Sequence, residues 1–140
     1  MAKFKGAEKQ NKGKKLAIAP TIEDNPEKQS PVFSLRHVDK SRYTLSDCTP
    51  QEKASFADKI WRLSQLTWAE LKVADKHGLG CEVLPQTAIK RATIPGHLSA
   101  DTKLVVFRFC AKAPMVGYRE RAIFHIIWFD RDFTLYDHGS

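Results

Sequence analysis

A set of basic side chains in the last quarter of the chain has the residue types that can bind or cleave a phosphodiester. Arg119, Arg121 and His125 lie close together in a stretch rich in β-branched and aromatic residues. Arginine holds phosphate oxygens through a planar fork of donors and stays charged at any working pH. Histidine exchanges protons near neutral pH. Such groups could bind RNA, assist attack of a 2′-hydroxyl on the adjacent phosphate and protonate the leaving oxygen without a metal.

The same side chains have a plain structural alternative, in which they line a solvent-facing surface of a sheet. Arg108, on a neighbouring strand, joins the basic set only if the register of the strands allows it. Lys90 and Arg91 form a basic pair of the kind that usually lies on a solvated surface, although such a pair can also contact phosphate. Both interpretations fit the sequence.

The acidic residues near the carboxyl end are better explained by a turn than by a metal site. Asp130, Asp132 and Asp137, together with His138, have the donor atoms that a divalent cation can use. Aspartate is also a favoured turn residue, and this is the preferred explanation. The chain contains no GxGxxG, P-loop, HExxH or GxSxG motif, and its three cysteines form no CxxC pair. We therefore predict no metal site and no cofactor.

Residues 103–136 are expected to form the sheet that holds these side chains. Runs of β-branched and aromatic residues broken by turn formers predict strands over 104–110, 115–118 and 121–129, a hairpin turn at 130–132 and a short edge strand over 133–136. Strict alternation along the third strand places Ala122, Phe124, Ile126 and Trp128 on one face. Arg121 and His125 then share the other face.

Two capping boxes predict two short helices before the sheet. Thr49 is followed by Pro50 and Glu52, and Thr67 is followed three positions later by Glu70. Gly78 is a suitable stop for the second helix. Trp61 and Trp68 are expected to pack in the core or at its shoulder rather than to serve as stacking platforms. A strand over 32–38 precedes the helices, and one helical turn over 85–89 follows them.

This order predicts an α+β domain with the elements β-α-α-β-β-β(-β), in which two short helices pack on an antiparallel sheet. Residues 31–140 form this single domain, and residues 1–30 are expected to be a basic, disordered tail and linker. Six lysines and one glutamate give residues 1–15 a charge of +5, which leaves only +2 of the total of +7 for the rest. No apolar run approaches the ~20 residues of a membrane span, so no membrane partner and a cytoplasmic location are expected.

The element order and a strand pair resemble the RelE/ParE superfamily of small bacterial toxins. The strand pair is VGYRER at 116–121, followed by FHIIWFD at 124–130. The resemblance implies a ribosome-dependent messenger-RNA endonuclease or a gyrase-directed toxin, held inactive by an antitoxin protein. It also implies roles for Arg119, Arg121 and the carboxy-terminal His138, with phosphate contacts from Lys90, Arg91 and Arg108. The alternative function is a non-enzymatic module that binds protein or nucleic acid through the sheet face and the lysine-rich tail.

Overall fold

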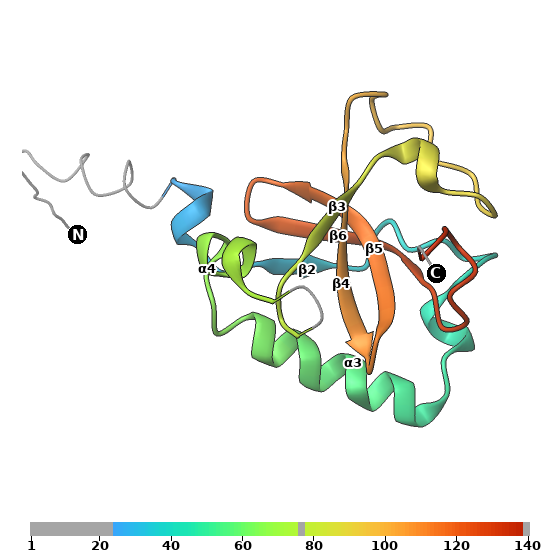
Figure 1. Ribbon diagram of the computed structural model, residues 1–140, viewed down its shortest axis with the longest axis horizontal. Helices are drawn as coiled ribbons and strands as arrows, with labels where there is room; N and C mark the ends of the chain where they lie inside the picture. The colour runs from blue at the N-terminus through green and yellow to red at the C-terminus, as the bar shows by residue number, and fades with distance from the viewer. Residues whose placement is uncertain (1–23, 76–77, 139–140) are drawn as a thin grey trace, which may run out of the picture.

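The computed structural model describes residues 24–75 and 78–138 of the chain, and the predicted tail lies largely outside them. The described part has the α+β fold that the sequence predicts, with α-helices packed on a five-stranded sheet (Figure 1). Its elements in chain order are η2 (Pro26–Lys28), β2 (Val32–Ser34), η3 (Leu45–Asp47), α3 (Pro50–Leu63), α4 (Trp68–Val73), β3 (Glu82–Leu84), η4 (Gln86–Ala88), β4 (Leu104–Cys110), β5 (Ala113–Glu120) and β6 (Ile123–Phe129). No helix among these is long and apolar enough to cross a membrane.

The sheet is mixed rather than purely antiparallel, with the strand order β2-β6-β5-β4-β3. The three neighbouring pairs from β6 to β3 are antiparallel, whereas β2 lies parallel to β6 and pairs Val32 with Ile123. The first strand ends at Ser34 instead of residue 38, because the Ser34 hydroxyl accepts the backbone N–H of Arg36 and a turn follows.

The prediction of an edge strand over 133–136 is wrong. The edge of the sheet beside β4 is formed by β3 instead. The Asp130 carboxylate accepts the backbone N–H groups of Thr134 and Leu135, which a strand ladder would have needed. Phe133 adopts a φ of 60°, which is incompatible with extended backbone. The segment after β6 is therefore a loop held by its own side chain.

A β-bulge in β6 reverses the predicted faces at the end of that strand. Val116 pairs with Trp128, but Gly117 pairs with Ile126, so Ile127 is an extra residue. Trp128 consequently packs on the face opposite Phe124. Gly117 permits this close approach, because a Cβ there would lie 2.0 Å from the His125 carbonyl oxygen.

Both predicted capping boxes are confirmed. Thr49 and Thr67 each accept the backbone N–H of a glutamate three residues later, and each glutamate accepts the threonine N–H in return, at 2.8 Å. The second helix ends at Val73 rather than near Gly78, because Ala74 is already extended. Trp61 is 64% exposed, contrary to expectation, whereas Trp68 is 1% exposed.

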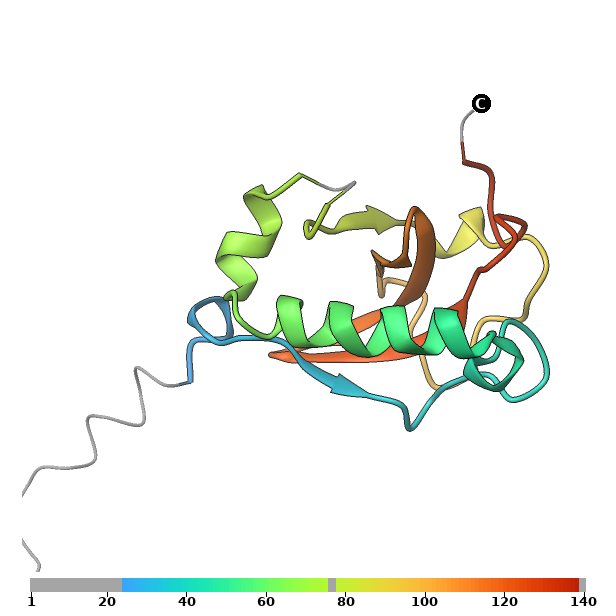
Figure 2. The ribbon, with the colours of Figure 1, turned by 90° about the horizontal axis from the view of Figure 1, so that it is seen from below.

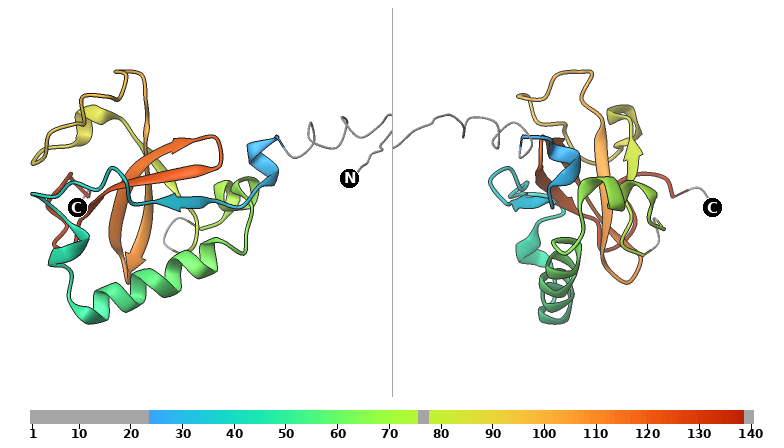
Figure 3. Two further views of the ribbon diagram at one scale, coloured as in Figure 1. Left: turned by 180° about the vertical axis from the view of Figure 1, so that it is seen from behind. Right: turned by 90° about the vertical axis from the view of Figure 1, so that its left-hand side faces the viewer.

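The two faces of the sheet carry separate apolar cores. The helices cover one face, where Phe56, Leu63 and Trp68 meet inward side chains of β4, β5 and β6 (Figure 2). The other face carries Leu104, Val106, Val116 and Trp128, covered by partly buried residues between 84 and 98 and by the carboxyl-terminal Leu135 and Tyr136. Figure 3 gives this arrangement from behind and edge-on. Little of the sheet surface is left open on either side.

Candidate active site

The structure does not bring the four predicted catalytic residues together. Arg119 and Arg121 contact the amino-terminal segment at η2, whereas His138 lies in the carboxyl-terminal segment, and these segments are at opposite ends of the molecule (Figure 1). His125 occupies a third place, in a group of aromatic rings beside β5.

Arg119 and Arg121 hold the segment around η2 against the β5–β6 turn. The Arg119 guanidinium bonds Glu27 and the carbonyl of Arg121, each at 2.6 Å, and lies 4.1 Å from the ring centroid of Trp68. Arg121 donates to the carbonyl of Asp24. Hydrogen bonds from Lys72 and Arg119 hold the pKa of the Glu27 carboxyl below its usual value. Both arginines are thus occupied by contacts within the protein.

His125 belongs to a group of four neighbouring rings, which we call the histidine column: His97, His37, His125 and Tyr118. Only His125 and Tyr118 are stacked, and the other neighbours are tilted. Neighbouring ring centroids lie 4.4, 5.3 and 4.7 Å apart in that order. The strand register supplies half of the column, because Tyr118 on β5 pairs directly with His125 on β6. His37 and His97 come from loops that are distant in sequence, and no local pattern predicts their meeting.

Some ring nitrogens of the column have hydrogen-bond partners, and at least one has none within the described chain. His125 Nε2 lies 2.9 Å from a Glu120 carboxylate oxygen, while its buried Nδ1 has no hydrogen-bond partner within the described chain. His97 Nε2 lies 3.0 Å from the Tyr118 hydroxyl. Burial lowers the pKa of His37, and the charges of His97 and His125 lower it further. A cavity of about 370 Å³, lined by His97, Leu98, Ser99, Thr102, Tyr118, Arg119 and Glu120, adjoins the column.

The second group is the carboxyl-terminal cluster: Arg108, Asp130, Tyr136 and His138. Asp130 is 0% exposed and uses its two oxygens to accept Thr134 N–H at 2.9 Å and Leu135 N–H at 3.1 Å. His138 Nε2 lies 3.3 Å from Oδ2 of the same carboxylate, and its ring centroid is 4.1 Å from that of Tyr136. The aspartate therefore serves the turn, as predicted, and also orients a histidine whose side chain is 24% exposed.

Arg108 is largely buried, near Tyr136, rather than on the surface. Its guanidinium pairs with Glu82 at 2.6 Å and donates to the Lys112 carbonyl at 3.1 Å, and the side chain is only 8% exposed. The hydroxyl of Tyr136 is buried without a well-formed hydrogen bond in the described chain. Burial raises the pKa of Tyr136, and the positive charge of Arg108 opposes that rise.

The two other predicted RNA-binding residues lie beside the carboxyl-terminal cluster. Lys90 donates its backbone N–H to the Leu135 carbonyl at 2.9 Å, and its ammonium lies 3.3 Å from Asp137. Arg42, which no sequence pattern singled out, donates to the Arg91 carbonyl at 2.7 Å. Arg42, Lys90, Arg91, Ala92 and Thr93 line an open pocket of about 430 Å³, here called the basic pocket.

Within residues 24–75 and 78–138, no three histidine, cysteine, aspartate or glutamate side chains are grouped as a metal site requires. Neither family models, nor curated proteins, nor solved structures gave a match to this chain. The geometry of its own side chains is therefore what supports a function.

Proposed function

We propose that this protein is a toxin-type, metal-independent RNA endonuclease that uses the carboxyl-terminal cluster as its active site. The observation that carries the proposal is the partly exposed His138, held 3.3 Å from the fully buried Asp130 carboxylate. It lies in a segment that Lys90 of the basic pocket contacts at Leu135 and Asp137. The order of one strand, two helices and a meander, on which the likeness to RelE/ParE toxins rests, is also present.

The chemistry needs one group that moves a proton and others that hold the phosphate. Asp130 fixes the orientation of the imidazole, as a buried carboxylate does for a catalytic histidine. His138 then accepts the proton of a 2′-hydroxyl as that oxygen attacks the neighbouring phosphorus. A 2′,3′-cyclic phosphate forms, the bond to the 5′-oxygen breaks, and water protonates the leaving oxygen.

The basic pocket is the part of this site that attracts the RNA backbone. Arg42, Lys90 and Arg91 present three cations, and the backbone bond from Lys90 to Leu135 ties the pocket to the segment that carries His138. Cations placed in this way bind phosphates without reading sequence. Arg108 supports Tyr136 from below in this scheme, and Arg119, Arg121 and His125 act away from the reaction.

The test is cleavage of messenger RNA by the purified protein, with and without ribosomes, alongside growth after expression in a bacterial host. His138→Ala should slow cleavage about 10²- to 10⁴-fold, the contribution expected of a proton-transferring side chain, and should relieve growth arrest. Arg121→Ala, at the other end of the molecule, is the matched control and should cleave at close to the wild-type rate. Unchanged cleavage by His138→Ala, or an inert wild-type protein, would reject the proposal.

A second candidate function is RNA binding without cleavage, and the basic pocket is the observation that favours it. The sheet faces predicted for such a module are covered by the two cores, so the pocket is the more suitable surface. The lysine-rich tail lies outside the described residues. Lys90→Ala should weaken RNA retention and reduce its dependence on salt, whereas deletion of residues 2–15 tests the tail separately.

A further inference from the structure

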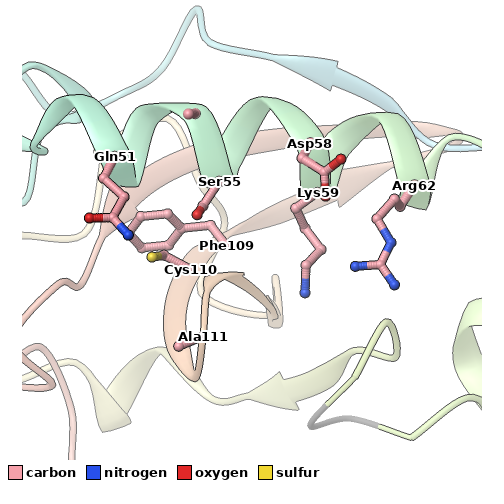
Figure 4. A pocket seen from close by; sticks show the side chains of 9 residues that line it. Gln51, Ser55, Asp58, Lys59, Arg62, Phe109, Cys110 and Ala111 are labelled. Atoms are coloured by element: carbon pink, nitrogen blue, oxygen red, sulfur yellow. The ribbon is translucent and has the colours of Figure 1, made fainter.

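A third cavity lies on the face of the sheet that the helices cover, between α3 and the β4–β5 turn. Gln51, Ser55, Lys59 and Arg62 recur at intervals of three or four along α3, so they share one side of the helix. They line a cavity of about 480 Å³ together with Ala54, Asp58, Phe109, Cys110 and Ala111. Figure 4 shows the side chains of Lys59 and Arg62 extending from the helix into the same space.

Neither cation in this cavity forms an ion pair with a carboxylate among the described residues, although Asp58 lines the same cavity. The Lys59 ammonium makes one polar contact, a long 3.5 Å approach to the Gly78 carbonyl. Burial lowers the pKa of Lys59, the charge of Arg62 lowers it further, and the charge of Asp58 opposes that fall. Like charges one helical turn apart oppose folding, and a partly desolvated ammonium adds to that cost. An anion bound between them would offset both effects.

We propose that this cavity binds a phosphate monoester. An ammonium offers three donors and a guanidinium five, a supply that suits the several oxygens of a phosphate better than the two of a carboxylate. Ser55 and Gln51 add neutral donors farther along the helix, and Phe109 gives an apolar wall. The volume is in the range of small-ligand pockets.

This site is independent of the proposed endonuclease activity, because the carboxyl-terminal cluster is associated with the other core. Phe109 belongs to the helix-side core, whereas Tyr136 belongs to the core on the far face. The phosphate monoester could be inorganic phosphate, the phosphate of a nucleotide or the 5′ end of an RNA. Each source gives a different binding pattern.

The experiment is isothermal titration of the full-length protein with inorganic phosphate, a nucleoside 5′-monophosphate, and a short oligoribonucleotide with and without a 5′-phosphate. At least one phosphate monoester should bind, and the 5′-phosphorylated oligonucleotide should bind better than its unphosphorylated form if RNA ends are the ligand. Lys59→Met and Arg62→Met should each weaken binding about tenfold or more. Lys53→Met is the matched control, since Lys53 is exposed on the same helix but does not line the cavity.

Two results would overturn the proposal: no binding by any of the phosphate ligands, or equal loss of binding in Lys53→Met and Lys59→Met. Thermal melting should establish that each variant is folded, and Lys59→Arg, which keeps the charge, should retain most of the affinity. Binding should also take up protons at alkaline pH, because the anion restores the pKa of Lys59. The uptake can be measured from titrations in two buffers of different ionisation enthalpy.

Discussion

The carboxyl-terminal cluster and the histidine column both pair a histidine with a carboxylate, and they do so in opposite ways. In the cluster, the carboxylate of Asp130 is fully buried and already bound to two backbone N–H groups before it meets His138. In the column, the side chain of Glu120 is 67% exposed, and its partner His125 is the buried member. His138 is oriented by a buried, fixed carboxylate. His125 is enclosed by aromatic rings and is paired with a solvent-exposed carboxylate.

The difference shows why a histidine in a sheet is a weak indication of catalysis by itself. His125 is buried between Tyr118 and His37, which leaves it little contact with a substrate. His138 combines exposure with a fixed partner, the two properties that proton transfer to a bound ligand requires. The contrast can be tested from both sides.

The largest expected effect comes from Gly117→Ala, which acts on the strand pair that carries Tyr118 and His125 of the column. The added Cβ would lie 2.0 Å from the backbone oxygen of His125, so β5 and β6 must separate at the bulge. We expect a loss of about 3 kcal/mol or more in the free energy of unfolding, measured by urea denaturation. Gly96→Ala, where nothing lies within 4 Å, should change stability by less than about 0.5 kcal/mol. Similar values for both variants would mean that the approach at Gly117 is not tight.

Replacing each carboxylate by its amide compares the two pairs directly. Asp130→Asn places an N–H₂ group against donors, so it should cost about 2 kcal/mol of stability and, under the proposed function, slow RNA cleavage. Glu120→Gln should cost less than about 0.5 kcal/mol, because exposed pairs contribute little. Asp132→Asn, an exposed neighbour in the same turn, controls for the charge change. A larger loss in Glu120→Gln than in Asp130→Asn would reverse the comparison.

The smallest expected effect is a dependence of stability on pH that arises in the column. The folded-state pKa of His37 lies below the usual value of about 6.5, so the unfolded chain binds more protons in that range. Its contribution is therefore complete above that value and is lost as the pH falls through the folded pKa. His97, His125 and Arg36 act in this direction, and Glu120 opposes them. His37→Asn should flatten the fall in melting temperature between pH 7 and 5; an unchanged profile would contradict this.

Local signals in the sequence predicted the helices and the principal strands well. A capping box needs only four consecutive residues, which explains why Thr49 and Thr67 marked both helix starts correctly. The predicted faces at the end of β6 were wrong because a bulge depends on the partner strand as well as on the strand itself. Gly117, which permits the close approach, is the residue in the sequence that indicates it. The prediction that Trp61 is buried was wrong because the position of a residue on a helix sets its exposure as strongly as its type does.

The candidate site was predictable only where its residues are close in sequence. The turn at Asp130 and the terminal His138 were both singled out, and eight positions separate them. From the sequence, Arg119 is a candidate catalytic residue because nothing near it along the chain shows that it has an ion-pair partner. That partner, Glu27, lies 92 positions earlier. His37 and His97 reach His125 only through the tertiary fold, so residue types alone could not assemble the column.

The parallel pairing of β2 with β6 determines when the fold can be completed. β2 is made near the start of the domain, but it pairs with the last strand of the sheet. Contacts at such a sequence separation slow folding, because a long loop must close before they form. During synthesis, β2 therefore remains an unpaired strand until β6 leaves the ribosome, and the chain is most prone to aggregate in that interval. A rearranged chain in which residues 24–38 follow residue 138 would shorten the interval and should fold faster.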